Sequence, residues 1–295
     1  MLLSDFIRRG TASLESLYPS PEARGLVLML CAERLGTASY THVVEPATVV
    51  PAGMEARLEE DLRRLQAGEP IQYVLGFTEF CGRRFSVGPG VLIPRPETEQ
   101  LVAEAVRALG GVSSPRVLDL CTGSGCIAWS LALEVPGAEV IGLDLSETAL
   151  DYAREQFPYI AGGRSLPDGA AGVNQAMFLQ ADVLDTEQEF PYGPFDLIVS
   201  NPPYVMERER ARMRPNVLDH EPALALFVPD DDPLLFYRAI ARWAQRFLRP
   251  GGIGLVEINE SLGPETAGVF RTAGLKNIQI LRDFAEKDRL IRFTF

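Results

Sequence analysis

The apolar residues of the first 70 positions recur at the spacing of amphipathic helices. In segments 20–36 and 53–68 they return every three or four positions, which places them on one face of a helix. Polar and charged residues fill the opposite face, as in helices that pack together in water. We therefore predict a small N-terminal helical bundle over residues 1–70.

Residues 71–95 have a different pattern, in which aromatic and branched residues alternate with glycine and polar residues. Such alternation predicts a β-hairpin, with the rest of the segment as a linker. Helical spacing returns at 95–109, with Pro96 at its start and with Leu101 and Ala105 on one face.

After residue 115, short apolar runs alternate with helix-type segments to the end of the sequence. This alternation is typical of a doubly wound sheet of parallel strands with helices on both faces. We therefore predict that residues 96–295 form one α/β domain. The predicted strands are 116–120, 138–145, 176–183, 195–200, 252–258, 277–281 and 289–295, and the predicted helices are 125–135, 146–157, 232–248 and 263–274.

Composition and charge narrow the class of protein. Of the 295 residues, 46% are hydrophobic and 23% are charged, which is ordinary for a soluble globular protein. No apolar run approaches the ~18–20 residues of a membrane span and no secretory leader is recognisable, so we expect a cytoplasmic location. The net charge of −12 disfavours a nucleic-acid partner, and Glu209 interrupts the arginines of 208–214.

The four cysteines and two histidines form no metal-binding pattern. No two cysteines have CxxC spacing, and His42 and His220 are isolated. We therefore predict no metal site and no disulfide framework. Cys121 and Cys126 are expected to be reduced packing residues.

The segment VLDLCTGSGCIA, residues 117–128, places two glycines between a predicted strand and a predicted helix. Glycine allows a ligand to approach the backbone closely, and Asp144 ends the next strand about 20 residues later. This arrangement is typical of nucleoside cofactor sites, where the carboxylate binds a ribose. It does not distinguish a nicotinamide dinucleotide from S-adenosylmethionine. The loop residues predicted to contact the cofactor are Cys121, Thr122, Gly123, Ser124 and Gly125.

Asp119 favours S-adenosylmethionine. It ends the first predicted strand of the α/β domain, just before the glycine loop. A carboxylate there repels a pyrophosphate and attracts ammonium and sulfonium charges. Asp182 stands at the end of the third strand, on the sheet edge where open α/β sheets bind ligands. Helix capping by Asp119, Asp144 and Asp182 stays open as an alternative.

A stiff polar turn, SNPPY, follows the strand predicted at 195–200. Asn201 offers a side-chain carbonyl as a hydrogen-bond acceptor, and Pro202, next to Pro203, offers a backbone carbonyl. Two acceptors can hold both N–H bonds of a planar NH₂ group and direct its lone pair at a methyl donor. Tyr204 is expected to pack on the substrate plane near the sulfonium charge. A rigid loop without chemistry is the alternative.

Such a clamp suits an amide nitrogen, whose delocalised lone pair is weakly nucleophilic. Acceptors on both N–H bonds stabilise the positive charge that develops as the methyl group arrives. Placement in line with the sulfonium supplies much of the remaining acceleration. No histidine, cysteine or other general base is required.

The glycine loop, Asp144 and NPPY together resemble the class I S-adenosylmethionine-dependent amino-methyltransferases. Residues 70–102, which include the motif IPRPETE, are similar to the peptide-chain release factor glutamine methyltransferase family. Residues 219–240 and 283–295 resemble the same family, so the similarity covers nearly the whole chain.

This resemblance implies a Rossmann-like, seven-stranded sheet whose final strand, near 289–295, is antiparallel, preceded by a helical domain and a hairpin. It implies methylation of the glutamine amide in the Gly-Gly-Gln motif of bacterial release factors, with S-adenosylhomocysteine as product. The cofactor loop falls on Cys121–Gly125, the ribose carboxylate on Asp144 and the substrate clamp on Asn201–Tyr204. Asn201 is also expected to contact the cofactor.

Three features depart from the family pattern. Most members have glycine where this chain has Cys121, so its Cβ is expected to crowd the methionine part of the cofactor. An aromatic residue often follows the acid at Asp182, where this chain has Val183, so aliphatic contact is expected to hold the adenine. The long segment 161–174, rich in glycine and alanine, has no assignable role.

Other functions stay open at this stage. The same clamp would serve a ribosomal protein glutamine or the exocyclic amine of a nucleic-acid base, but IPRPETE favours release factors and the net charge disfavours nucleic acid. A nicotinamide-dependent dehydrogenase would bind NAD and fail to bind S-adenosylhomocysteine. A non-catalytic binding module on the same fold is disfavoured by the intact Asn201 and Asp144.

Overall fold

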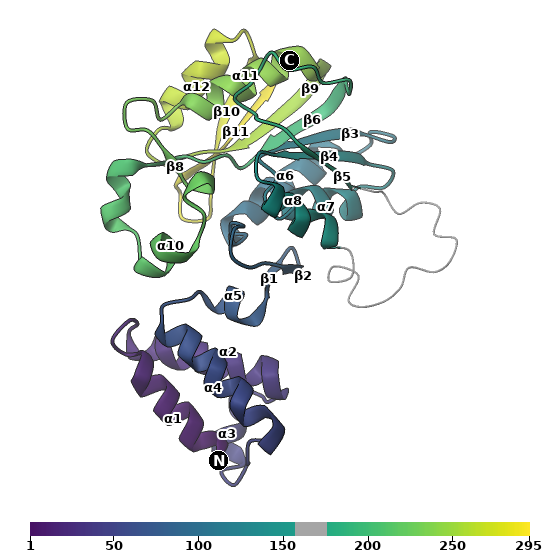
Figure 1. Cartoon of the computed structure of the whole chain (residues 1–295). Coiled ribbons are helices and arrows are strands. Elements are labelled where there is room, and N and C mark those ends of the chain that lie inside the picture. The colour runs from purple at the N-terminus through teal and green to yellow at the C-terminus, as the bar shows by residue number, and fades with distance from the viewer. Residues whose placement is uncertain (157–175) are drawn as a thin grey trace. The chain divides into compact units, whose positions relative to one another are not determined.

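The structure, a computed structural model, describes residues 1–156 and 176–295. The segment 161–174, which is rich in glycine and alanine, lies outside the described residues. None of the helices in the described part has both the length and the apolar content that crossing a membrane requires. The chain, shown in Figure 1, divides into two compact units.

The first unit is helical and comprises Met1–Phe77 together with Arg214–His220. Its helices are α1 (Leu3–Leu14), α2 (Ser20–Leu35), α3 (Thr41–Val44), α4 (Ala52–Gln66), α5 (Ile71–Leu75) and α10 (Pro215–His220). The apolar faces of α1, α2 and α4 meet in one core, where Phe6, Leu30 and Leu62 are almost completely buried. The predicted small helical domain is confirmed.

Ion pairs connect distant parts of the helical unit. Asp61 on α4 is buried and accepts a 2.7 Å hydrogen bond from Arg34 Nε on α2. Arg34 also donates to the carbonyl of Val74 in α5 at 2.9 Å. Arg214, directly before α10, pairs with Glu22 on α2. The α10 segment therefore belongs to the helical unit, although the residues on either side of it in the sequence belong to the second unit.

The second unit comprises Thr78–Met213 and Glu221–Phe295 and contains a seven-stranded sheet. Its strands are β3 (Arg116–Leu120), β4 (Glu139–Asp144), β5 (Ala176–Gln180), β6 (Phe195–Ser200), β9 (Leu248–Glu257), β10 (Lys276–Arg282) and β11 (Asp288–Thr294), in the spatial order β10-β11-β9-β6-β3-β4-β5. The pairs among β3, β4, β5, β6 and β9 are parallel, and β11 is antiparallel to both neighbours. The predicted sheet is confirmed, including its antiparallel final strand.

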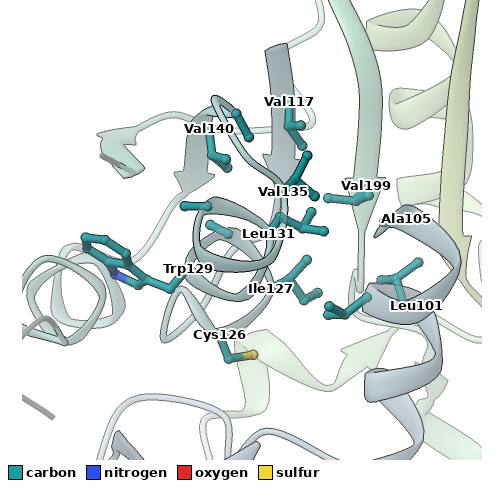
Figure 2. Close-up of a cluster of buried hydrophobic side chains, with 14 of the residues drawn as sticks. Leu101, Ala105, Val117, Cys126, Ile127, Trp129, Leu131, Val135, Val140 and Val199 are labelled. Carbon is teal, nitrogen blue, oxygen red and sulfur yellow. The ribbon is translucent and has the colours of Figure 1, made fainter. Parts of the chain in front are cut away.

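Helices cover both faces of this sheet (Figure 1). They are α6 (Glu99–Ala108), α7 (Cys126–Glu134) and α8 (Glu147–Glu155) on one face, and α11 (Leu235–Phe247) and α12 (Gly263–Thr272) on the other. Figure 2 shows the first of the two cores, where Leu101 of α6 and Leu131 of α7 face valines of the strands. Each face of the sheet thus has its own hydrophobic cluster, which holds the strands in place.

Short elements connect these layers. Residues Ile71–Leu75 form α5 where the sequence pattern predicted only hairpin and linker, because Pro70 begins a turn that Gly76 ends with a φ of 89°. The remaining short elements are β1 (Phe77–Phe80), β2 (Arg83–Ser86), β7 (Val205–Met206), β8 (Phe227–Val228) and the 3₁₀ helices η1 (Pro96–Thr98), η2 (Glu207–Arg212) and η3 (Ala223–Ala225). β1 pairs with β2, and β7 pairs with β8.

Gly254 on β9 lies opposite Phe293 on β11, and its missing side chain makes room for the ring. A Cβ at Gly254 would stand 2.0 Å from Cζ of that ring, so Gly254→Ala should destabilise the second unit by about 1–3 kcal/mol through overpacking. Unfolding in denaturant, followed by tryptophan fluorescence, measures this, because Trp129 and Trp243 both lie in the second unit.

Gly268→Ala on α12 is the matched control, because nothing lies within 4 Å of its added Cβ. Alanine is the better helix former, so this variant should gain up to about 1 kcal/mol. A Gly254→Ala protein as stable as the unaltered chain would contradict the packing argument.

Candidate functional site

A pocket of about 150 Å³ lies at the carboxyl ends of β3, β4, β5 and β6. Because these strands are parallel, the residues that follow them meet at one edge of the sheet. Residues 90–92, Pro222 and Leu224 are also part of the wall. The predicted site residues that line it are Cys121, Gly123, Asp144, Asp182, Val183, Asn201 and Pro203. Those that do not are Asp119, Thr122, Ser124, Gly125, Pro202 and Tyr204.

Asp144 ties the glycine loop to the turn after β4. Its Oδ2 accepts a hydrogen bond from the Gly123 N–H at 2.8 Å, and its Oδ1 accepts one from the Ser146 N–H at 2.9 Å. Gly125, which ends the loop, has a φ of 76°, a conformation that favours glycine. Burial raises the pKa of Asp144, and the backbone N–H groups oppose this rise. Each oxygen keeps a second lone pair, which can accept a hydrogen bond from a ligand hydroxyl.

Asp119 lies behind the pocket wall. It precedes the last residue of β3, its side chain is fully buried, and it accepts a 2.6 Å hydrogen bond from the Thr122 hydroxyl. Burial raises the pKa of Asp119 to about 7, the Thr122 hydrogen bond opposes this rise, and the charge of Asp144 adds to it. Asp119 therefore supports the glycine loop from beneath. Its contact with a cofactor stays a prediction.

Cys121 lines the pocket in a left-handed backbone conformation, with a φ of 61°. Holding a residue with a Cβ in this conformation costs on the order of 1–2 kcal/mol, which explains why glycine suits the position. Burial, and then the charges of Asp144 and Asp119, raise the pKa of the Cys121 thiol well above its usual value. The thiol therefore stays protonated and is a poor nucleophile.

The turn after β5 contributes both charge and apolar surface to the wall. Asp182 accepts a 2.9 Å hydrogen bond from the Leu184 N–H, which shapes the turn. The carbonyl of Val183 accepts a 2.9 Å hydrogen bond from Trp243 Nε1 on α11, which fixes the backbone beside the pocket. Val183 and Leu184 of this turn, and Leu145 after β4, are apolar residues of the lining.

Asn201 directly follows β6 and lines the pocket. Its Nδ2 donates to the Thr98 hydroxyl oxygen at 3.1 Å, and the Thr98 hydroxyl donates to Glu257 Oε2 at 2.8 Å. Within the described residues, neither the Asn201 side-chain carbonyl nor the Pro202 backbone carbonyl accepts a hydrogen bond. Both of the acceptors that the NPPY motif predicted are thus free of protein donors there.

Glu257, the last residue of β9, is 1% exposed and also accepts a 2.9 Å hydrogen bond from the Tyr204 hydroxyl. Burial raises the pKa of Glu257, while the hydrogen bonds from Thr98 and Tyr204 and the charge of Arg289 oppose the rise. Burial and the charge of Glu257 raise the pKa of Tyr204 well above its usual value, so its hydroxyl is a neutral donor. The Tyr204 ring packs against the hydrophobic cluster around α11. Its contact with a substrate stays a prediction.

Sequence reasoning missed Thr98, Glu257 and a third buried group, Glu221. Glu221 accepts a 3.1 Å hydrogen bond from the Ile93 N–H and forms an ion pair with Arg95 at 2.6 Å. These contacts hold the segment after residues 90–92 against the segment that contains Pro222. The sequence carried a signal for two of them. Thr98 lies in the motif IPRPETE, and Glu257 is an acid at a strand end, as Asp144 is.

The residues of this pocket fit S-adenosylmethionine. Asp144 and Asp182 place carboxylates where they can accept hydrogen bonds from ribose hydroxyls and attract positive charge. The apolar lining residues Leu145, Val183 and Leu184 suit a flat base. Asn201 also lines the pocket, and its carbonyl oxygen has no donor within the described residues.

Known proteins match both parts of the chain. A family profile described as a methyltransferase domain matches residues 112–262, and one described as the PrmC N-terminal domain matches residues 5–76. The release factor glutamine methyltransferase of Bacteroides thetaiotaomicron is 40% identical over 279 residues, covering 95% of each chain. That of Flavobacterium psychrophilum is 35% identical over 303 residues, covering 100% of each chain.

Among solved structures, the release factor-specific protein-(glutamine-N5) methyltransferase of Alicyclobacillus acidocaldarius is 31% identical, with a TM-score of 0.41. The match covers 71% of this chain and 98% of that one. The relatives from Bacteroides and Flavobacterium match over almost their whole lengths, and the two profiles cover both the helical segment and the parallel strands. The chain belongs to the release factor glutamine methyltransferase family.

Proposed function

We propose that this protein transfers the methyl group of S-adenosylmethionine to the side-chain amide nitrogen of the glutamine in the Gly-Gly-Gln motif of bacterial peptide chain release factors. The S–CH₃ bond breaks as the N–CH₃ bond forms, and the products are the N5-methylated glutamine, S-adenosylhomocysteine and one proton, which the amide nitrogen releases to water. Family membership supports the reaction and the substrate class. The observation that carries the proposal is Asn201, which lines the pocket: its NH₂ group is bound to Thr98, and its carbonyl oxygen accepts no hydrogen bond from any described residue.

Different residues of the pocket wall contact different parts of the cofactor. Asp144 accepts hydrogen bonds from the ribose hydroxyls, and the loop at Gly123 lets the cofactor approach the backbone closely. Val183 and Leu184 contact the adenine, and the buried carboxyl of Asp119 adds negative potential beneath the loop. When bound, S-adenosylmethionine supplies an electrophilic methyl group on a sulfonium.

The NPPY turn holds the substrate. The carbonyl oxygens of Asn201 and Pro202 accept the two N–H bonds of the glutamine amide, so that its nitrogen faces the methyl group. As the nitrogen acquires positive charge, these acceptors bind its N–H bonds more strongly than in the ground state, which lowers the barrier. Pro202 and Pro203 restrict the backbone, so the acceptors need no reorganisation during the reaction.

A methyl-transfer assay tests the proposal. Purified protein, isotope-labelled S-adenosylmethionine and a bacterial release factor should give a labelled factor, with the methyl group located on the Gly-Gly-Gln glutamine by mass spectrometry. The same factor with that glutamine replaced by alanine should take no label. If neither factor is labelled while S-adenosylhomocysteine binds, the proposed substrate is wrong, and a ribosomal protein or a nucleic-acid base is tested next.

Removal of the Asn201 carboxamide should affect the reaction and leave cofactor binding nearly unchanged. Asn201→Ala is expected to lower kcat by roughly 10²–10³, the usual effect of losing one group that stabilises the transition state. Asn277→Ala, which removes an exposed carboxamide bonded to Thr294, is the control and should keep full activity. Turnover within a few-fold of the unaltered protein would exclude Asn201 as the clamp.

Removal of the Asp144 carboxylate should act mainly on the cofactor. Asp144→Ala is expected to weaken S-adenosylhomocysteine binding by about 1.5–3 kcal/mol, because charged hydrogen bonds to the ribose are lost. Isothermal titration calorimetry measures the change. Asp151→Ala, which removes an exposed acid on α8 that pairs with Arg154, is the control. An unchanged Kd for Asp144→Ala would show that other groups hold the ribose.

A further inference from the structure

Asn201, Thr98 and Glu257 form a continuous chain of hydrogen bonds from the pocket wall to a buried carboxyl group. We propose that Glu257, acting through Thr98, sets the direction in which the Asn201 carboxamide faces, and so keeps its carbonyl oxygen toward the target amide. Glu257 and Thr98 are thus positioning residues. The inference rests on the proposed function, because it concerns the acceptor that binds the substrate NH₂ group.

The need for positioning comes from the shape of a carboxamide. Its oxygen and its NH₂ group are nearly equal in size, so a rotation of 180° about the last bond exchanges them at little steric cost. With the oxygen toward the substrate, Asn201 accepts an N–H bond. With the NH₂ group there instead, two sets of N–H donors face each other and the clamp is lost. A catalytic asparagine therefore requires a neighbour that distinguishes its two ends.

Glu257 distinguishes them because a carboxylate only accepts hydrogen bonds. The Thr98 hydroxyl therefore directs its hydrogen to Glu257 Oε2, at 2.8 Å. Its oxygen then presents only lone pairs to Asn201, and the group that can approach it is the Asn201 NH₂ at 3.1 Å. The carbonyl oxygen is left on the opposite side.

Burial fixes the orientation of this chain of hydrogen bonds. Thr98 is 2% exposed and Glu257 is 1% exposed, so water has little access to replace a missing partner. Glu257 also accepts from the Tyr204 hydroxyl at 2.9 Å, which holds its other oxygen in place. The carboxyl group is thus fixed by two donors from two different segments and cannot rotate freely.

The Thr98 hydroxyl makes no helix-capping bond. Thr98 ends η1 and directly precedes α6 with helical backbone angles, φ −68° and ψ −18°. Its hydroxyl bonds to Glu257 instead, on a different part of the chain.

The first test compares valine and serine at position 98. Thr98→Val keeps the shape and removes the hydroxyl, so kcat should fall roughly 5- to 10-fold with an unchanged Kd for S-adenosylhomocysteine. Thr98→Ser restores the hydroxyl and should restore most of the rate. Thr266→Val is the matched control, because this threonine on α12 is fully buried and its hydroxyl has no partner in the described part of the chain. Equal rates for Thr98→Val and the unaltered protein would overturn the proposal.

A double-mutant cycle separates positioning from general structure. If Thr98 acts through Asn201, then Thr98→Val should change the rate by less than about twofold in an Asn201→Ala background. The same 5- to 10-fold loss in both backgrounds would show that Thr98 acts by some other route. Glu257→Gln provides an independent arm, since its amide can donate to Thr98 and free the hydroxyl hydrogen to face the Asn201 oxygen. Its kcat should fall as that of Thr98→Val does.

The orientation of Asn201 can also be measured without turnover, by NMR. The side-chain NH₂ signals of Asn201 in an ¹⁵N-labelled sample are identified by their loss in Asn201→Ala. They should move in Thr98→Val and Glu257→Gln and stay in place in Thr266→Val. Signals that do not move in either variant would overturn the proposal. If the unaltered protein labels no release factor, the proposed function fails, and the NH₂ signals still decide how Asn201 is oriented.

Discussion

The parallel pairing of β3 with β4 and β6 is the constraint on which the site depends. In the observed register Leu120 lies beside Leu143 on one side and beside Ser200 on the other. Cys121, Asp144 and Asn201 are the residues that follow these three in sequence, so they stand at the same height at the ends of neighbouring strands. Strands lie about 4.8 Å apart, which brings the three turns around one small ligand. A shift of one residue in either pair would separate the carboxylate from the carboxamide.

Buried carboxyl groups give the site its electrostatic character. Asp119, Asp144 and Glu257 all have a pKa raised by burial, so each ionised group carries a desolvation cost. The compensation differs among them. Asp144 accepts hydrogen bonds from two backbone N–H groups, and Glu257 accepts hydrogen bonds from two hydroxyl groups. Asp119 accepts a hydrogen bond from the Thr122 hydroxyl. A ligand with positive charge would offset part of the cost at the two aspartates, which couples cofactor binding to the stability of the loop.

The parts of the site that the sequence predicted are those defined by local order along the chain. The glycine loop, Asp144 and Asn201 each follow a recognisable apolar strand, and the rule that ligands bind at the carboxyl edge of the sheet brings them together. The alternation of strand and helix predicted the doubly wound parallel sheet, and the resemblance to the methyltransferase family implied its seven strands and its antiparallel last strand.

What the sequence did not reveal depends on packing and on side-chain direction. The bond between Thr98 and Glu257 joins residues 159 positions apart, and no spacing rule connects them. Asp119 was expected in the pocket because it stands near a strand end. It precedes the last residue of β3, however. Because successive side chains of a strand point to opposite faces of the sheet, a difference of one position decides whether a side chain lines the pocket or lies in the interior. Residues Ile71–Leu75 are too few to show helical periodicity.

The path of the chain also determines how this protein can be divided. Arg214–His220 belongs to the helical unit, yet it is encoded between two parts of the unit that holds the pocket. A chain shortened to begin at Thr78 would keep Arg214 and α10 but lose Glu22 and the helices on which that segment lies. The helical unit therefore cannot be separated from the rest of the protein by a single cut in the chain. Exchange of an N-terminal region between two relatives would succeed only if the sequence around α10 were exchanged with it.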